Sequence, residues 1–247
     1  STRQVVARKN IGTQGAITAR APDEIWQADL ISMEPLSEVK ANTSNFILIA
    51  ADVFTRKLRA TPVATKDPEV VVEGLKRIGV RGGVPKGALD VDRGGEFGGA
   101  VLTFLAGLNP PVSIIYKDSE DDLAVVDRAG GLLKKALYQK MRSGRTSVWA
   151  PLLANLVAGH NERPHVALGS APPNRVGAGD EMMDLTVLRA NTKKMERVAQ
   201  AWVKSKRGIG VGSKVRLKLK QQTRRFRRGT AAQYSNRVHT VVRMYQD

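Results

Sequence analysis

The chain has 247 residues, a formal net charge of +17, 42% hydrophobic and 26% charged residues, so it is long enough for one large domain or two small ones and can bury a core. It contains no cysteine, which excludes disulfides and cysteine-based zinc sites and fits an intracellular protein. No apolar run approaches the roughly 20 residues that span a bilayer, so we expect no membrane partner.

The positive charge is concentrated at the carboxyl-terminal end. Residues 193–247 contain 16 basic and two acidic side chains, so they carry +14 of the net charge of +17. A concentrated positive field favours a polyanion through phosphate contacts and counterion release. Apolar residues alternate with polar ones in this segment, which favours a folded basic module over a solvated tail. We therefore expect nucleic acid, DNA or RNA, as a partner.

Residues 1–22 predict a basic arm or linker. The first twenty residues contain four basic and no acidic side chains and lack a long apolar segment, so a remnant of an organelle-targeting peptide is the less favoured interpretation. The opening serine leads us to expect a chain that was excised from a longer one.

Three strands are predicted in the next part of the chain, at Glu24–Pro35, Phe46–Asp52 and Lys57–Val63. The second is the continuous apolar run FILIAAD, which is typical of a strand buried on both faces. The third is expected to be its hairpin partner. A helix then begins at Asp67-Pro68, because an aspartate cap followed by proline favours a helix start, and it ends at Gly82-Gly83.

Two short strands alternate with three helices in the middle of the chain. In order, these elements are a strand at Ala88–Val91, a helix at Ala100–Leu108, a strand at Ser113–Tyr116, a helix from about Asp121 and a helix at Ser147–Ala158. Asp92 follows the first of these strands, and Asp127 lies in the first turns of the fourth element. Strands interleaved with helices predict an α/β domain with a mixed sheet.

A segment rich in proline and glycine, Pro164–Gly179, marks a domain boundary. The next segment, Glu181–Ser205, predicts a long linker helix that packs on the core or on a partner. Alternating stretches that begin at Val215 and Val238 predict strands of a small all-β module. The expected domains are the arm at 1–22, a core at 23–178, the linker helix at 179–207 and a basic β module at 208–247.

Three aspartates, Asp29, Asp92 and Asp127, have apolar neighbours and are expected to converge from two strands and a helix. A site for two-metal phosphoryl transfer needs hard oxygen ligands around ions about 3.5–4 Å apart. Mg²⁺ suits such a site because it takes few protein carboxylates and accepts phosphate oxygens from the substrate. The chain has 23 acidic residues, so chance alone also produces many triples of this kind.

Three motifs in this order resemble the core of retroviral and retrotransposon integrases. They are W-x-x-D-L around Asp29, D-x-G-x-E-F from Asp92 to Phe97, and the helix Asp127–Lys135. His160–Gly169 resembles the family's Y-N-x-x-x-H-x-A-L stretch, and Ala171–Asn174 resembles the T-P-x-E that follows it. The basic end, with Gly212–Leu217 and Phe226–Thr230, is similar to the SH3-like carboxyl-terminal domain of retrotransposon integrases.

The resemblance implies an α/β fold with a ribonuclease H-like mixed sheet flanked by helices, followed by a linker helix and a small SH3-like β-barrel. It implies an integrase-like polynucleotidyl transferase of a retrotransposon-like element. Two Mg²⁺ or Mn²⁺ ions would serve in DNA 3′-end processing and strand transfer, with Asp29, Asp92 and Asp127 as the catalytic and metal-binding residues. A homo-oligomer or a larger nucleoprotein assembly in the nucleus is expected.

The sequence departs from the family at the third acid, which is normally glutamate where this chain has Asp127. Aspartate is shorter, so it reaches the other two acids only if its helix moves inward; Asp121 or Asp122 is an alternative ligand. Gly130-Gly131 weakens that helix by about 1 kcal/mol per glycine relative to alanine. The family's amino-terminal zinc-binding domain, with its paired histidines and cysteines, cannot form here.

These departures motivate an alternative function. The chain would be a domesticated, catalytically inactive integrase-like protein that binds nucleic acid or serves as a structural component of a ribonucleoprotein, with an organelle as its location. A ribonuclease H-like nuclease that cuts RNA–DNA hybrids is a third and weaker interpretation.

Nine basic residues are expected to contact nucleic acid: Lys134, Lys135, Lys214, Arg216, Lys218, Arg224, Arg225, Arg227 and Arg228. Four other polar residues are expected to have structural roles. Asp52 is expected to cap a turn, and Glu96 to orient the loop after Asp92. His160 and His165 lie five positions apart around a proline, which suits packing or turn hydrogen bonds better than a shared zinc ion.

Overall fold

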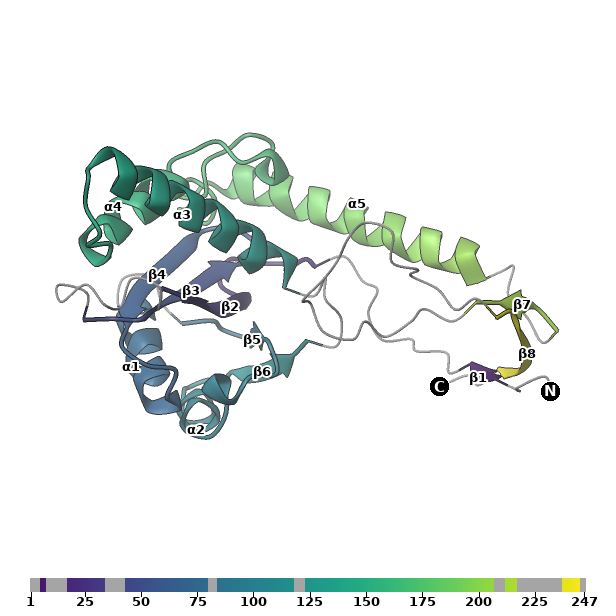
Figure 1. Cartoon of the computed structure of the whole chain (residues 1–247). Coiled ribbons are helices and arrows are strands. Elements are labelled where there is room, and N and C mark those ends of the chain that lie inside the picture. The colour runs from purple at the N-terminus through teal and green to yellow at the C-terminus, as the bar shows by residue number, and fades with distance from the viewer. Residues whose placement is uncertain are drawn as a thin grey trace. The chain divides into compact units, whose positions relative to one another are not determined.

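The computed structural model describes residues 5–7, 17–33, 43–79, 84–117, 123–206, 212–216 and 237–244 (Figure 1). The chain forms two compact units. The larger is Ile17–Thr192, and the smaller combines Ser1–Ala16 with Lys193–Asp247. Within the described ranges, no helix combines the length and the apolar character that crossing a membrane requires.

The larger unit is built on a five-stranded mixed sheet. Its strands are β2 (Ile25–Ser32), β3 (Phe46–Asp52), β4 (Leu58–Val63), β5 (Ala88–Val91) and β6 (Ser113–Tyr116), and their order is β4-β3-β2-β5-β6. β3 pairs antiparallel with both β2 and β4, whereas β5 pairs parallel with both β2 and β6. The expected mixed sheet is therefore confirmed, and this order is compatible with a ribonuclease H-like core.

Four helices cover the two faces of this sheet (Figure 1). α1 (Pro68–Gly79) and α2 (Ala100–Ala106) lie on one face, and α3 (Ala124–Ser143) and α4 (Ala150–Asn161) lie on the other. Both faces of β3 are covered: Leu48 packs in the core cluster of α1 and α2, while Ile47 and Ile49 pack in that of α3 and α4. Burial on both sides explains why β3 has no polar face.

A third cluster joins the start of the larger unit to the long helix α5 (Glu181–Lys206). Val187 of α5 packs with Phe54 and Val176, and the Asn191 side chain donates a hydrogen bond of 3.1 Å to the backbone oxygen of Ala19. The first half of α5 therefore packs on the core. This agrees with the expectation that the linker helix packs on the core or on a partner.

Element boundaries differ from the sequence-based expectation by a few residues. α4 begins at Ala150 instead of Ser147, because the chain from 146 to 149 is not helical and Trp149 is buried ahead of Pro151. The expected starts or ends at Asp121, Gly82-Gly83 and Pro35 lie outside the described residues. Two short 3-10 helices, Gly95–Phe97 and Val166–Leu168, were not anticipated.

The smaller unit contains a three-stranded sheet of order β1-β8-β7. β8 (His239–Met244) pairs antiparallel with β7 (Lys214–Val215) and parallel with β1 (Val5–Ala7), a strand within the segment expected to be an arm. Residues 217–236 lie outside the described ranges, so the closed SH3-like barrel stays a prediction.

The two adjacent glycines of α3 have different surroundings. A Cβ added at buried Gly130 would lie 3.3 Å from Cδ1 of Ile31 and 3.6 Å from Cδ1 of Ile49, whereas one added at exposed Gly131 would meet nothing within 4 Å. Gly130 therefore has a packing role against β2 and β3. Gly131 lowers the stability of the helix, and no close packing contact requires a glycine there.

The substitution Gly131→Ala is expected to raise the free energy of unfolding by about 0.5–1 kcal/mol, because alanine loses less backbone entropy in a helix. Gly130→Ala is expected to gain less or to destabilise, since Ile31 must give way to the new Cβ. Urea unfolding of the two variants measures the difference. Equal gains in both would show that α3 does not pack closely on the sheet at Gly130.

Candidate carboxylate site

Strand register sets Asp29, Asp92 and Lys117 in one row across the sheet. Gln27 of β2 is paired with Asp90 of β5, the last pair of the two strands, and the same alignment continued by two residues brings Asp29 to the level of Asp92, which directly follows β5. Val91 of β5 lies opposite Tyr116 of β6, so the next residues, Asp92 and Lys117, are also neighbours. The side chains at one row position point to the same face, and here that face is the one covered by α3.

Asp29 feels the charges of both other expected acids. Burial raises the pKa of its carboxyl above the ordinary value, and the negative charges of Asp127 and Asp92 raise it further. The pKa is lowered by the amide of Leu30, which donates a hydrogen bond of 2.8 Å to Oδ1, and by the charge of Lys117. Asp92 and Asp127 thus both lie close enough to Asp29 for their charges to act on its carboxyl; we call the three residues the acid centre.

Asp92 is held by two local contacts. Its Oδ2 lies 2.7 Å from Nζ of Lys117, and its Oδ1 accepts a hydrogen bond of 3.0 Å from the backbone amide of Arg93. The loop that follows is anchored by the fully buried Phe97, whose backbone oxygen accepts a hydrogen bond of 3.2 Å from the Tyr116 hydroxyl. The Glu96 carboxylate lies against Gly94, where an added Cβ would collide with it.

Gln27 positions the helix that carries Asp127. Its fully buried side-chain oxygen accepts hydrogen bonds of 3.1 and 3.2 Å from the backbone amides of Val125 and Val126. α3 has no side-chain cap from its own N-cap residue, Leu123, so Gln27 satisfies amides that a local cap would otherwise reach. Sequence reasoning missed this role. The available signal was a polar residue two positions before Asp29, within a buried strand.

The sequence motif around Asn161 has a structural role. The Asn161 side chain accepts a hydrogen bond of 2.8 Å from the amide of Leu58 and donates one of 2.8 Å to the oxygen of the same residue. The end of α4 is thereby joined to β4. The expected turn role of His165 is confirmed, because its Nδ1 accepts a hydrogen bond of 3.2 Å from the amide of Ala167. Burial lowers the pKa of both His160 and His165.

Asp52 caps the turn between β3 and β4, as expected. Its carboxylate accepts hydrogen bonds from the amides of Phe54 and Thr55 at 3.1 and 3.2 Å and from the Thr55 hydroxyl at 2.5 Å. These contacts occupy both of its oxygens, which supports a structural role.

The acid centre offers hard oxygen donors of the type that Mg²⁺ prefers. In the described ranges, however, no group of three His, Cys, Asp or Glu side chains is close enough to hold a metal ion. The donor chemistry of the three carboxylates therefore fits a divalent cation, whereas no three of the described acids and histidines are spaced to hold one.

Of the nine basic residues expected at a nucleic-acid interface, four are described. Lys134 is half-buried and Lys135 is exposed on α3, and Lys214 and Arg216 are exposed at β7. Lys218, Arg224, Arg225, Arg227 and Arg228 lie outside the described residues.

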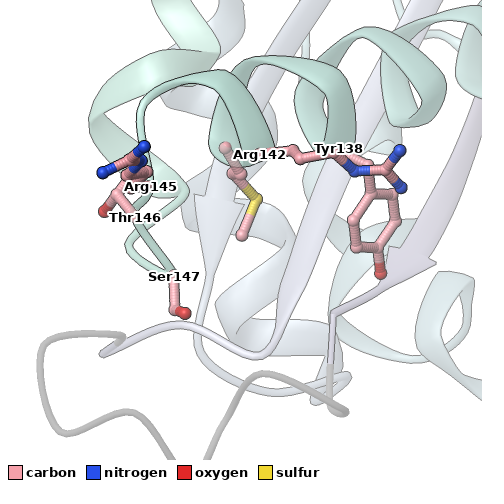
Figure 2. Close-up of a pocket in the computed structure, with 6 residues that line it drawn as sticks. Tyr138, Arg142, Arg145, Thr146 and Ser147 are labelled. Carbon is pink, nitrogen blue, oxygen red and sulfur yellow. The ribbon is translucent and has the colours of Figure 1, made fainter.

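The structure adds two arginines of α3, Arg128 and Arg142, that sequence reasoning missed, and these lie in a row with the expected Lys135. Arg128, Lys135 and Arg142 are exposed and recur every seven residues, which is about two helical turns, so they lie on one side of the helix. We call them the α3 basic row. Beyond it, an open pocket of about 390 Å³ is lined by Tyr138, Met141, Arg142, Arg145, Thr146 and Ser147 (Figure 2). Figure 2 shows that Tyr138 and Arg142 come from the last turns of α3 and the other labelled residues from the following loop.

Structural comparison finds a related fold in a viral nucleoprotein complex. A chain in the cryo-electron microscopy structure of the simian T-cell lymphotropic virus intasome, in complex with PP2A regulatory subunit B56 gamma, is similar to this chain with a TM-score of 0.55 at 15% sequence identity. The match covers 69% of this chain and 58% of that chain, so this chain spans less than two thirds of its neighbour's length. At this identity, the likeness shows the fold alone. No protein-family model matches the sequence, and no curated protein matches it.

The raised pKa of Asp29 predicts a dependence of stability on pH. The folded chain binds the Asp29 proton more tightly than the unfolded chain, whose pKa is near the ordinary 3.8. The ionised carboxylate therefore destabilises the fold as pH rises through the folded-state pKa, and this effect is absent at lower pH. In the presence of a chelator, Asp29→Asn is expected to unfold at a higher temperature than the original chain at pH 7.

The gain in Tm is expected to be about 2–4 °C for each kcal/mol removed, and it should disappear near pH 3. Thermal unfolding followed by circular dichroism measures it. Glu73→Gln, at an exposed position of α1, is the control for loss of one negative charge. A lower Tm for Asp29→Asn at pH 7 would contradict the inferred destabilisation by the carboxylate.

Gln27→Met keeps the side-chain length but removes the oxygen that accepts two amide hydrogen bonds. The free energy of unfolding is expected to fall by about 1–3 kcal/mol, because the amides of Val125 and Val126 lose a buried partner. Gln139→Met, at an exposed position of the same helix, is the matched control and should change stability by less than about 0.5 kcal/mol. Urea unfolding distinguishes the two, and equal effects would refute the positioning role.

Proposed function

We propose that the chain is an integrase-like polynucleotidyl transferase of a retrotransposon-like element, which processes DNA 3′ ends and joins them to a target strand. The observation that carries this proposal is the placement of Asp29 on β2, of Asp92 at the end of neighbouring β5 and of Asp127 on α3, which packs on the sheet; the charges of Asp92 and Asp127 both act on Asp29.

Phosphoryl transfer of this type needs negative charge to be neutralised on the attacking and leaving oxygens. Two bound Mg²⁺ or Mn²⁺ ions would supply that neutralisation and would activate water or a 3′ hydroxyl. Asp29 and Asp92, neighbours in one sheet row, would hold them with Asp127. Gln27 keeps Asp127 on the same face by holding the start of α3.

The α3 basic row supports DNA as the substrate. It begins at Arg128, directly after Asp127, and continues along the helix through Lys135 to Arg142. Phosphates bound along this row would lead toward the acid centre. Lys214 and Arg216 of the smaller unit are also exposed and could bind phosphate by themselves. The structural likeness to a chain of an intasome supports action within an oligomeric nucleoprotein assembly, which we place in the nucleus.

A second candidate function is a catalytically inactive nucleic-acid-binding protein. It is favoured by the ion pair between Asp92 and Lys117, and by the lack of a three-ligand metal group within the described part of the chain. In that case the α3 basic row would still bind the phosphate backbone, and the acid centre would be a remnant.

A strand-transfer assay with labelled donor DNA and Mg²⁺ or Mn²⁺ tests the first function. The original chain should be active, and Asp92→Asn should lose activity by at least about a hundredfold, because a carboxylate that serves the transition state is removed. Glu73→Gln, on α1 and away from the acid centre, should retain full activity. Equal activity in Asp92→Asn would exclude this catalytic mechanism.

DNA binding measured at several salt concentrations, together with the strand-transfer assay, distinguishes the second candidate function from the first. Both functions predict that Lys135→Gln and Arg142→Gln weaken binding and reduce its salt dependence. Only the second predicts binding with no strand transfer under either metal. That result would contradict the enzymatic proposal and leave the binding function in place.

A further inference from the structure

The backbone of Lys117 is held in place beside the acid centre by hydrogen bonds. It is the first residue after β6, and its amide donates a hydrogen bond of 3.0 Å to the oxygen of Val91, the last residue of β5. Its own backbone oxygen accepts a hydrogen bond of 3.4 Å from Nε of Arg93. The backbone at Lys117 is thus tied to the residues on both sides of Asp92, which limits where its side chain can reach.

The Lys117 ammonium is shielded from water more than an ordinary surface lysine. Its Nζ lies 2.7 Å from Oδ2 of Asp92, and the two side chains are 18% and 49% exposed. The pair between Lys76 and Glu73 on α1 has the same length, 2.7 Å, but its side chains are 50% and 63% exposed. Solvent screens the α1 pair more strongly, so the Lys117 pair is the stronger of the two.

The same ammonium acts on more than one acid. Its positive charge lowers the pKa of Asp29, opposing the burial of that carboxyl and the charges of Asp127 and Asp92. Lys117 therefore neutralises part of a region that holds three carboxylates. A divalent cation bound there would compete with the ammonium for the Asp92 carboxylate and would be repelled by its charge.

We propose that Lys117 is a tethered counter-ion of the acid centre, which holds Asp92 in the absence of metal and must be displaced before a divalent cation binds. The inference rests on the proposed function, because it takes metal binding at the acid centre as its premise. Lysine suits this role because its ammonium is a compact charge on a flexible stem, which can leave without any movement of the backbone.

Calorimetric titration of the full chain with Mn²⁺ alone tests the competition. Lys117→Met removes the charge and keeps the apolar stem, so it should bind Mn²⁺ about three- to tenfold more tightly than the original chain. Lys117→Arg keeps the charge and should not gain affinity. Lys76→Met, which breaks an ion pair of the same length on α1, should leave the affinity unchanged.

The double variant Lys117→Met with Asp92→Asn locates the effect. It should lose the tighter binding, because the oxygen released by Lys117 is no longer a carboxylate oxygen. Lys117→Gln is a second neutral variant, and it should show the same gain in Mn²⁺ affinity. It replaces Lys117→Met in the test if the methionine variant does not fold.

Chemical labelling tests displacement in the original chain without any substitution. Acetylation of lysines by acetic anhydride, quantified by mass spectrometry, should increase at Lys117 when Mn²⁺ is added, because the ammonium leaves Asp92. Labelling of Lys76 should stay the same. Unchanged labelling of Lys117 at saturating Mn²⁺ would overturn the inference.

The outcomes separate this inference from the proposed function. Equal Mn²⁺ affinity of the original chain and the neutral Lys117 variants would overturn the counter-ion role and leave the metal centre standing. Absence of saturable Mn²⁺ binding in the original chain and in all Lys117 variants would overturn both, and would favour the inactive nucleic-acid-binding protein.

Discussion

The candidate site depends on the register of three neighbouring parallel strands. β2, β5 and β6 are aligned so that Asp29, Asp92 and Lys117 occupy one row, on the face of the sheet that α3 covers. A shift of one residue in any of these strands would turn its charged side chain toward α1 and α2. The buried side chains of Leu89 and Val91 oppose such a shift, because they fill the core on that other face.

Like charges in a partly buried site oppose folding, and this conflict explains several contacts of the acid centre. Backbone amides of Leu30 and Arg93 donate to Asp29 and Asp92, and Lys117 adds a full positive charge. The Leu30 amide and the Lys117 charge each favour the ionised form of Asp29. Burial of Asp29 nevertheless remains the largest influence on its pKa and opposes ionisation.

The motifs that suggested a family contain two kinds of residue. In the stretch W-x-x-D, Trp26 is buried, and Cζ of Arg59 lies 4.0 Å from the centroid of its ring. Gln27 accepts a hydrogen bond from the start of α3, and only Asp29 belongs to the acid centre. In the stretch around His160, Asn161 joins α4 to β4. Much of the resemblance therefore reflects packing and helix placement, which are properties of the fold.

The local pattern of the sequence determined the strands and helices of the larger unit. Continuous apolar residues in β3, the aspartate and proline before α1, and the strand that ends at Asp92 are signals carried within a few neighbouring residues, so they can be read without a structure. The three acids could be proposed for the same reason, since each lies in a recognisable local motif. The start of α4 was placed less well: the residue before it, Trp149, is fully buried, and its burial depends on the rest of the core.

Only the tertiary structure decided which distant residues meet. Gln27 bonds to amides 98 and 99 positions away, Lys117 pairs with Asp92 across two strands, and β1 joins β8 near the other end of the chain. From the sequence, Gly130 was expected only to weaken α3; the structure shows that it packs against Ile31 of β2. Such contacts depend on strand register and helix placement, which arise from the whole core and leave no signal in a short stretch of sequence.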